Sequence, residues 1–383
     1  MGRILFITND FPPQSGGIQT FIEGLIRELP LNSVVVHAPS YRDKEAEEKC
    51  DQKFFDELGV VVVRDRRKLL LPTPGLLRRV AGTAHAHDVK QVVFGASVPL
   101  GLLAPALRRR GATNAIAITH GHEVWWSKLF PFSVLLRRVA KSVDYLTYLG
   151  DFTAQSISRA IRPQDRSKLV HLPPGVDINF FQPGEKPEVL MDKYSLVGKK
   201  VILCVGRLVQ RKGQDQLIAA MPELLKRHPD VHLLIVGGGN YKNKLVTLAQ
   251  RLRVDDHVTF AGRIEYAELP AHFRLASIFA SPTRDRFGGL EIEGLGIVYL
   301  EASASGVAVI AGKDGGSPDA VIDGTTGLIV DGKDSSAITH ALDELLTDAA
   351  KCAQMGAAGR AWMERDWSWE VIGKRFRSLL HLN

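Results

Sequence analysis

The sequence has few cysteines and no long uncharged segment. Its three cysteines, Cys50, Cys204 and Cys352, lie far apart and form no C-x-x-C motif. This spacing excludes a disulfide framework and a cysteine metal cluster and indicates a reducing compartment. The longest uncharged stretch, residues 92–107, is interrupted by prolines and glycines and is shorter than the roughly 20 apolar residues of a membrane-spanning helix. Residues 1–8 are too short for a signal peptide core, so we expect a cytoplasmic protein.

Motifs that mark other nucleotide chemistry are also absent. The sequence has no G-x-G-x-x-G and no P-loop, so dinucleotide oxidoreductases and ATPases lack their central feature here. It has no D-x-D, which removes the usual carboxylate pair for a metal ion that bridges a diphosphate. We therefore expect neither a metal nor another cofactor.

Positive charge is concentrated in the first half of the chain. The formal net charge is +7, and residues 64–141 contain 14 basic and 3 acidic side chains. Two segments there, residues 64–79 and 125–138, mix basic and apolar residues, which suits either the surface of an anionic bilayer or two helices with solvated edges. The membrane interpretation uses Arg66, Arg67, Lys68, Arg78 and Arg79. No nucleic-acid recognition motif accompanies the charge, so we expect no nucleic-acid partner.

Short apolar runs alternate with helical patterns along the chain. The predicted strands are residues 3–8, 33–37, 60–63, 91–94, 115–119, 201–205, 232–236, 258–260, 278–280 and 307–311. Between them, segments such as 20–29, 214–226 and 242–251 have apolar residues at helical spacing. A break rich in proline and glycine spans residues 172–184. The pattern predicts an α/β protein with two doubly wound, Rossmann-like domains facing across a cleft, which strand C-termini and helix N-termini would line.

Two loops that follow predicted strands carry glycines and cations. One places Gly16 and Gly17 directly before a helix, where free amides favour an anion, although a plain tight turn explains the glycines equally well. The other, residues 205–213, places Arg207 and Lys212 at the carboxyl edge of the second sheet. Two cations there would neutralise a diphosphate and assist the breaking bond, or would be surface charges of a loop.

Two glutamates and a histidine complete the candidate site. Glu293 and Glu301 are eight residues apart, which is ~12 Å if most of the segment is helical. Paired carboxylates of a retaining hydrolase need about 5–5.5 Å, so we expect one glutamate at each end of an elongated ligand such as a nucleotide-sugar. His120 would hydrogen-bond a substrate hydroxyl. Together with His122 and Glu123 it has metal-binding residue types, but alternate residues of an extended segment point to opposite sides.

In this order, these features resemble the GT-B glycosyltransferases of family 4. The resemblance rests on Gly-Gly-Ile at 16–18, Gly-Val-Asp at 175–177, the Gly-Arg…Arg-Lys-Gly of 206–213 and the E-x7-E of 293–301. It covers nearly the whole chain. The segment from Trp367 resembles the part of this fold that crosses back to the N-terminal domain.

The resemblance implies a retaining, metal-independent hexosyl transfer from a nucleoside-diphosphate sugar. Family 4 enzymes are thought to use front-face attack without an enzyme nucleophile, so positioning and leaving-group stabilisation would carry the catalysis. The fold would comprise an acceptor-binding domain, residues 1–178 with a C-terminal helix at 368–383, and a donor-binding domain at 179–367.

The resemblance also assigns roles to individual residues. Arg207 and Lys212 would hold the diphosphate, while Glu301 would take the ribose hydroxyls. Glu293 would bond the sugar hydroxyls, and His120 would contact the sugar near its C6 hydroxyl. The catalytic residues would be Arg207, Lys212, Glu293 and His120. The donor-binding residues would be Gly16, Gly17, Arg207, Lys212, Arg263, Glu293, Leu295, Gly296, Ile297 and Glu301. The candidate acceptor contacts are Asn9, Asp10 and Gln19.

Within the family, the chain resembles the actinobacterial phosphatidylinositol mannoside mannosyltransferases. These use GDP-mannose and a lipid acceptor at the cytoplasmic face of the membrane, and a basic acceptor domain suits docking to anionic lipids. The partners implied are a nucleotide-sugar donor, a lipid acceptor and an anionic membrane surface. The location implied is peripheral, on the inner face of the cell membrane.

Other interpretations keep parts of this pattern. A family 4 transferase that uses a UDP- or ADP-sugar on a soluble acceptor would carry the same cations and glutamates. A GT-B-like sugar-nucleotide epimerase would bind the same donor without transferring the sugar, although the E-x7-E favours transfer. A basic membrane-binding or scaffold protein without turnover would require Arg207, Lys212, Glu293 and Glu301 to be incidental.

Overall fold

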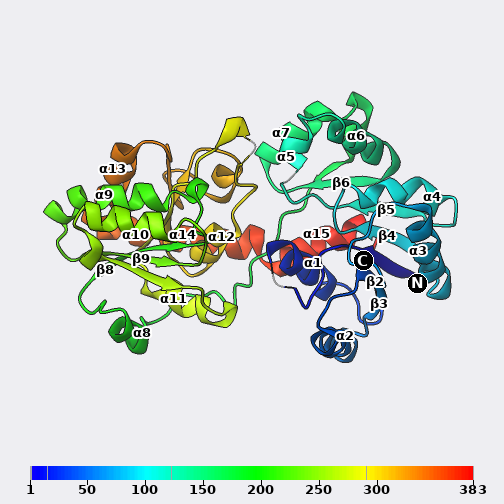
Figure 1. Cartoon of the computed structure of the whole chain (residues 1–383), viewed down its shortest axis with the longest axis horizontal. Coiled ribbons are helices and arrows are strands. Elements are labelled where there is room, and N and C mark those ends of the chain that lie inside the picture. The colour runs from blue at the N-terminus through cyan, green and yellow to red at the C-terminus, as the bar shows by residue number, and fades with distance from the viewer. Residues whose placement is uncertain (1, 15, 122, 290, 383) are drawn as a thin grey trace. The chain divides into compact units, whose positions relative to one another are not determined.

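The computed structural model describes residues 2–14, 16–121, 123–289 and 291–382. The chain folds into two compact units (Figure 1), which are described separately below. Unit 1 comprises Met1–Gly175 and Trp369–Asn383, and unit 2 comprises Val176–Ser368. No helix in the described part of the chain is long and apolar enough to span a membrane.

Unit 1 is built on a seven-stranded parallel sheet with the order β3-β2-β1-β4-β5-β6-β7. Its strands are β1 (Arg3–Ile7), β2 (Val34–Pro39), β3 (Val61–Asp65), β4 (Val89–Phe94), β5 (Asn114–Ala117), β6 (Tyr145–Tyr148) and β7 (Leu169–His171). Its helices are α1 (Gly17–Arg27), α2 (Lys44–Leu58), α3 (Pro74–Ala86), α4 (Ala104–Arg108), α5 (Glu123–Trp126), α6 (Phe132–Ser142), α7 (Asp151–Ala160) and α15 (Trp369–Leu379). Every residue of β2 is buried, as expected of a parallel strand covered on both faces.

Unit 2 repeats this plan with a six-stranded parallel sheet of order β10-β9-β8-β11-β12-β13. Its strands are β8 (Lys200–Val205), β9 (Val231–Val236), β10 (Val258–Gly262), β11 (Ile278–Ser281), β12 (Ala308–Gly312) and β13 (Gly327–Val330). Its helices are α8 (Glu188–Lys193), α9 (Gln214–Arg227), α10 (Lys242–Arg251), α11 (Leu269–Leu275), α12 (Ile297–Ala304), α13 (Ser335–Thr347) and α14 (Ala349–Trp362). The predicted fold class of two doubly wound parallel sheets is therefore confirmed.

The strand order of each sheet indicates where a ligand would bind. In both sheets the order reverses beside the first strand, between β1 and β4 in unit 1 and between β8 and β11 in unit 2. Ligands of open parallel sheets bind at this switch point, outside the carboxyl ends of the strands. In unit 2 the loops at that place are residues 206–213 and 282–296.

The C-terminal helix α15 packs on α1 in unit 1, as the red and dark blue helices of Figure 1 show. Two glycines make room for its first residue, because a Cβ atom on Gly24 or Gly175 would lie 2.1 or 2.6 Å from the Trp369 indole. Further along, the Phe376 ring meets the edge of Phe6, with ring centroids 6.1 Å apart. The end of the chain is thus an integral part of the core of unit 1.

The Gly24–Trp369 contact gives a stability prediction. Gly24→Ala should lower the free energy of unfolding by about 1–3 kcal/mol, the usual effect of overpacking a filled interior. Gly82→Ala is the matched control, because a Cβ there meets no atom within 4 Å in the exposed part of α3, and it should raise stability by about 0.5–1 kcal/mol. Thermal and urea unfolding of both variants test this contrast. Equal effects of the two substitutions would contradict the tight packing of α15 on α1.

Candidate active site

The loop after β8 brings a buried lysine to the switch point of unit 2. Gly206 has a φ of 147°, in the region that favours glycine, and the Lys212 side chain runs alongside it. Gly213 has a φ of 78° at the start of α9, and a Cβ atom there would lie 2.2 Å from the Pro282 carbonyl oxygen. Lys212 is 7% exposed. A loop of this shape holds an ammonium group inside the protein instead of releasing it to solvent.

Lys212 and Arg211 both bind the carboxylate of Glu293. The Lys212 Nζ lies 2.8 Å and the Arg211 Nη1 2.5 Å from the same oxygen, Glu293 Oε2. Burial acts to raise the pKa of Glu293, but the charges and hydrogen bonds of the two cations outweigh it and lower this pKa to about 2. The cluster therefore consists of two positive charges around one carboxylate and carries a net positive charge at neutral pH.

The segment after Glu293 ends at the start of α12. Gly296 has a φ of 85° there, and α12 has no acidic residue in its first turn. The first amide groups of a helix have no partner within it, and together with the helix dipole they attract an anion. Gly316 fixes the path of this segment, since its amide donates to the Glu293 carbonyl and a Cβ atom on it would lie 2.0 Å from the Gly294 oxygen.

Glu301 lies inside α12 and is 3% exposed. Burial raises the pKa of its carboxyl to about 8, and the charge of Lys212 offsets only part of this effect. The helix begins at Ile297, so Glu293 lies on the preceding loop and the ~12 Å spacing expected for a continuous helix does not apply. The two glutamates thus differ in environment, since Glu293 is paired with two cations and Glu301 is held in a largely apolar helix.

Arg207 and Arg263 lie at the same edge of the sheet, after β8 and β10, and neither is one of the two cations that bind Glu293. Both side chains are exposed. Arg207 follows Gly206, and its carbonyl accepts a hydrogen bond from Gln214 Nε2. Arg263 follows β10 and lies against the glycine loop after β9, where a Cβ on Gly238 would meet its Nε at 2.8 Å. These two arginines extend the positive edge, and both are accessible to a ligand.

The ion pair between Arg211 and Glu293 was not among the predicted interactions. Arg211 stands next to Lys212 in the predicted loop, but the sequence gives no indication which of the two side chains turns toward Glu293. The structure shows that both do. The backbone reinforces Arg211 from the other loop, because the Arg284 amide donates to the Arg211 carbonyl at 2.9 Å.

At the switch point of unit 1, the structure brings together Gly16, Gln19 and Asp10. Gly16 precedes α1, and the Gln19 side chain folds over it, so that a Cβ atom on Gly16 would lie 2.6 Å from Gln19 Oε1. Gln19 Nε2 donates to Asp10 Oδ1 at 3.2 Å. The space around Gly17 is open. Polar groups and a helix N-terminus therefore meet at this edge of the sheet.

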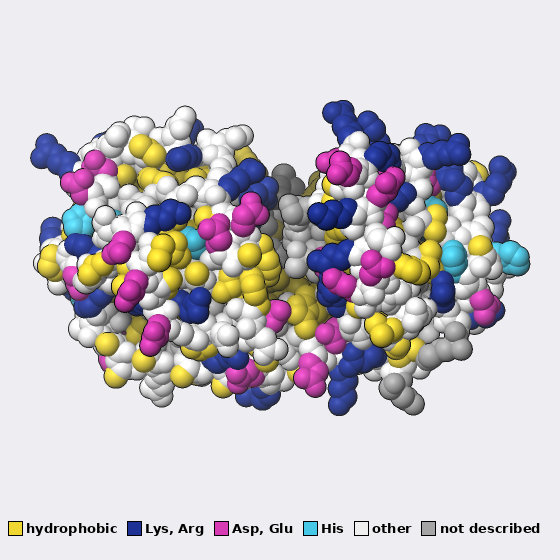
Figure 2. All heavy atoms as spheres, turned by 90° about the horizontal axis from the view of Figure 1, so that it is seen from below, with side chains coloured by type: hydrophobic (Ala, Val, Ile, Leu, Met, Phe, Trp, Pro, Cys, Tyr) yellow, Lys and Arg dark blue, Asp and Glu magenta, His cyan; other side chains and the backbone are white. Residues whose placement is uncertain are grey.

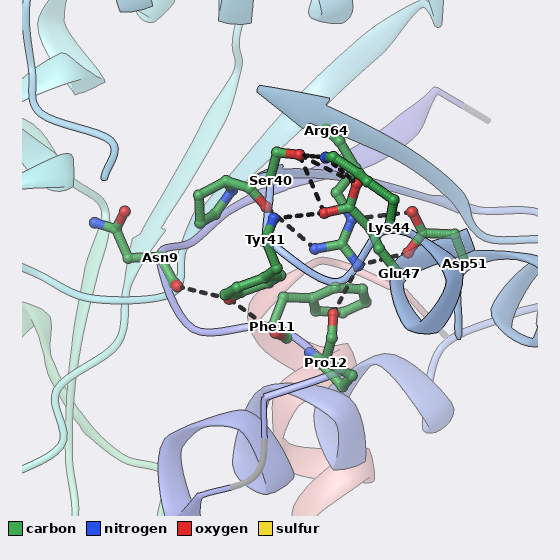
Figure 3. Close-up of polar contacts among 10 residues, drawn as sticks. Asn9, Phe11, Pro12, Ser40, Tyr41, Lys44, Glu47, Asp51 and Arg64 are labelled. Carbon is green, nitrogen blue, oxygen red and sulfur yellow. Dashed lines mark hydrogen bonds and ion pairs between the residues drawn. The ribbon is translucent and has the colours of Figure 1, made fainter. Parts of the chain in front are cut away.

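Asn9 has a different environment. Its amide exchanges two hydrogen bonds with the backbone of Leu70, at 3.1 and 2.7 Å. In Figure 3 its side chain points away from the neighbouring polar network. The Tyr41 hydroxyl of that network donates to the Asn9 and Phe11 carbonyls. Asn9 thus fastens the loop after β1 to the segment after β3, while its acceptor role stays a prediction.

Arg64 anchors the same loop from β3. Its guanidinium pairs with Asp51 of α2 at 2.5 Å, donates to the Pro12 carbonyl at 2.6 Å and lies over the Phe11 ring (Figure 3). The Glu47 carboxylate accepts hydrogen bonds from the Tyr41 amide and from Ser40 beside it. This network holds residues 9–12 in place next to the helix N-terminus.

His120 lies on the loop after β5, beside the switch point of unit 1. Its ring Nε2 is 2.5 Å from the carbonyl oxygen of Gly95, which follows β4. The Glu123 carboxylate accepts hydrogen bonds from the His120 amide at 3.0 Å and from the Ser97 hydroxyl at 2.8 Å. Glu123 therefore joins the loop after β5 to the segment after β4. His122 lies outside the described residues. Among those that are described, no group of three or more His, Cys, Asp or Glu residues is arranged to hold a metal ion.

The basic residues of the predicted membrane contact fall into two groups. Arg66, Arg67 and Lys68 are exposed next to Leu69 and Leu71, which are 57% and 49% exposed. We call residues 66–71 the basic loop. Arg78 is also exposed, on α3. Lys and Arg side chains are prominent over unit 1, the right-hand part of Figure 2.

Arg79 differs from the other predicted membrane residues. Its Nε lies 2.7 Å from the carboxylate of Asp65, whose side chain is fully buried. The same carboxylate accepts a hydrogen bond from the Arg67 amide and contacts the buried His37 ring. Removing Arg79 would leave a buried charge without its main partner, so this residue has a structural task whether or not it contacts lipid.

Two family models match the chain, one in each half. Glycosyltransferase Family 4 matches residues 15–180, and Glycosyl transferases group 1 matches residues 188–362. A curated protein of Mycolicibacterium smegmatis is 45% identical over 98% of this chain and 98% of its own length. The chain belongs to the GT-B glycosyltransferases of family 4. The family that the sequence resembles is thereby confirmed, and so is the prediction that the protein is a glycosyltransferase.

The relatives of this glycosyltransferase have specific names. The M. smegmatis protein is named GDP-mannose-dependent alpha-(1-6)-phosphatidylinositol monomannoside mannosyltransferase. A Corynebacterium glutamicum protein named for the monoacylated form of that acceptor is 42% identical over 99% of this chain and 97% of its own length.

Solved structures share the fold of this chain. An Anabaena HepE structure with UDP has a TM-score of 0.81 at 19% identity, covering 99% of both chains. The Thermosynechococcus elongatus sucrose-phosphate synthase has a TM-score of 0.79 at 20%, covering 100% of this chain and 98% of its own.

The raised pKa of Glu301 predicts a pH-dependent difference in stability. The stability that a buried neutral carboxyl contributes is fully present below its ordinary pKa of 4.5 and is lost as the pH rises to about 8. Glu301→Gln keeps the neutral shape. The unfolding free energy of the wild type should therefore fall relative to that of the variant over this range, as measured by urea unfolding. Glu293 does not titrate there, because its pKa is about 2. A difference that is constant with pH would contradict the assignment.

Proposed function

We propose that this glycosyltransferase transfers mannose from GDP-mannose to a phosphatidylinositol mannoside-type lipid. The observation that carries the transfer chemistry is the ion cluster of Arg211, Lys212 and Glu293 beside the N-terminus of α12. Positive charge and free helix amides at one edge of a parallel sheet suit the diphosphate of an activated sugar. The choice of donor and acceptor is supported by relatives at 41–45% identity over 98–99% of the chain that are named for these substrates.

In this proposal, the donor-binding residues of unit 2 have distinct tasks. Lys212 and Arg207 bind the diphosphate and stabilise the charge that develops on the leaving group. Glu293 accepts hydrogen bonds from the sugar hydroxyls. When Lys212 turns to the phosphate, Arg211 stays as the partner of the Glu293 carboxylate and keeps it ionised. Glu301 takes the ribose hydroxyls, and Arg263 lies near the base.

From unit 1, the proposal takes the amides of Gly16 and Gly17 for the diphosphate and His120 for a sugar hydroxyl. Asp10 and Gln19 are the candidate acceptor contacts, and their mutual hydrogen bond aligns both side chains. In the proposed reaction, the acceptor attacks the same face of the sugar that the leaving group leaves, so the anomeric configuration is retained. No enzyme nucleophile takes part, and the site contributes by positioning the two substrates and stabilising the leaving group. Two cations, Arg207 and Lys212, serve the diphosphate together with these amides, so the proposed reaction needs no metal ion.

The proposal places the enzyme peripherally on the cytoplasmic face of the membrane. The basic loop offers three exposed cations beside two exposed leucines. Leucine side chains enter the interfacial layer of a bilayer, while each Lys or Arg near an anionic surface contributes about 1 kcal/mol of attraction. This arrangement brings the enzyme to the surface that contains its lipid acceptor.

A transfer assay with radiolabelled sugar donors tests the reaction. With phosphatidylinositol monomannoside as acceptor, we expect transfer from GDP-mannose and little from UDP-glucose or ADP-glucose. Lys212→Ala should lower kcat by about 10²–10³, the usual cost of removing one group that stabilises the charge of a transition state. Lys226→Ala is the control, because Lys226 is exposed on the outer part of α9. Near-normal turnover of Lys212→Ala would remove its role, and a UDP- or ADP-sugar preference would overturn the donor assignment.

Vesicle sedimentation tests the membrane contact of the basic loop. The triple variant Arg66→Gln, Arg67→Gln and Lys68→Gln should bind anionic vesicles more weakly by about 1 kcal/mol per charge. Arg79 is left unchanged because it pairs with buried Asp65. Binding that equals that of the wild type would exclude the basic loop as a docking surface.

A further inference from the structure

Unit 1 contains a groove of about 810 Å³ next to α4 and α6, on residues that the proposed transfer reaction does not use. Apolar atoms of Leu102, Pro105 and Val143 contribute to its wall. Pro105 is exposed and Leu102 is half-buried, so apolar surface is open to a ligand along the groove. A groove of this size accommodates a portion of a flexible apolar chain.

Among the described residues that line the groove, four are cations and one is acidic. The acid, Asp144, is paired with Arg108. Arg108 Nε also donates to the Ser142 carbonyl at 3.0 Å, and Lys168 Nζ donates to the Ala140 carbonyl at 2.9 Å. These bonds satisfy carbonyls at the C-terminus of α6 and compensate the negative end of its dipole. An anion that enters the groove is therefore not repelled by the end of the helix.

The other two cations remain available. Arg138 and Lys141 are exposed and three residues apart on α6, so they lie on the same face of the helix and repel each other. Within the described ranges, no acidic side chain pairs with either of them. An arrangement that keeps two like charges adjacent and unpaired beside an apolar groove suits a ligand with one anionic end and one apolar end.

We infer that this groove binds one anionic phospholipid, with the phosphate at Arg138 and Lys141 and an acyl chain along Leu102 and Pro105. The apolar wall favours a lipid over a free nucleotide, and the concentration of cations favours an anionic head group over a neutral one. The inference goes beyond the proposed reaction, because the groove belongs to α4 and α6 and not to the loops at the switch point.

Exposed aromatic surface on the same helical segment supports a membrane-derived ligand. Phe130, directly before α6, is 85% exposed, and Leu129 beside it is 39% exposed. α6 has 11 residues and is about 16 Å long, so an apolar tip at its start and the groove at its end lie within reach of a single lipid surface. Exposed Phe and Leu side chains on surface helices insert into the interfacial layer of a bilayer.

A photo-crosslinking experiment with the full chain tests the inference. The probe is phosphatidylglycerol with a diazirine on its acyl chain, in phosphatidylcholine vesicles, and mass spectrometry locates the label. We expect labelling within residues 100–110 or 138–144. The double variant Arg138→Gln and Lys141→Gln should need about 30-fold more vesicles for the same labelling, which corresponds to about 1 kcal/mol for each of two charges.

The controls separate this groove from other lipid contacts. Lys242→Gln with Lys244→Gln removes two exposed cations from α10 in unit 2 and should label as the wild type does. Label confined to residues 66–71, or unchanged labelling of the Arg138/Lys141 variant, would overturn the inference. The probe carries neither mannose nor inositol, so a failed transfer assay would not affect this result. Unchanged thermal unfolding of both double variants shows that loss of labelling is not loss of fold.

Discussion

The largely buried carboxylate of Glu293, bound by Lys212 and Arg211, is the interaction on which the candidate site of unit 2 depends. A single cation would leave Glu293 and a ligand phosphate in competition for the same charge. With two cations, one can move to the phosphate while the other continues to compensate the carboxylate. A buried carboxylate without any partner would be strongly destabilising, so the pair of cations lets the site exist both with and without its ligand.

Close backbone packing makes this cluster possible. The loop after β8 and the segment before α12 come from distant parts of the sequence, and glycines let them meet, since Cβ atoms on Gly213 and Gly316 would lie within 2.2 Å of carbonyl oxygens. In unit 1, the equivalent loop is fixed by side chains, with Arg64 and Asn9 bound to backbone carbonyls. The same switch-point geometry is therefore stabilised by different means in the two units.

Much of this organisation could be predicted from the sequence, because buried parallel strands read as apolar runs. The strands that were not predicted, β6, β7 and β13, are short and only partly buried. The predicted strands β5 and β11 are equally short, but every residue in them is buried. The positions of Arg207 and Lys212 after β8 followed from the strand pattern. The shared use of Glu293 by Arg211 and Lys212 did not, because it depends on how two distant loops approach each other. The same reason concealed the pairing of Arg79 with Asp65.

A thermal-shift panel of GDP, UDP, ADP and their sugar conjugates, run on the wild type and on Lys212→Ala, tests the central claim most directly. A donor at 100 times its Kd stabilises the folded state by about 2.7 kcal/mol. The account predicts that GDP and GDP-mannose stabilise the wild type selectively and that Lys212→Ala loses most of this stabilisation. Selective stabilisation by UDP or ADP compounds would contradict the donor assignment, and an undiminished GDP effect in Lys212→Ala would show that the ion cluster does not bind the diphosphate.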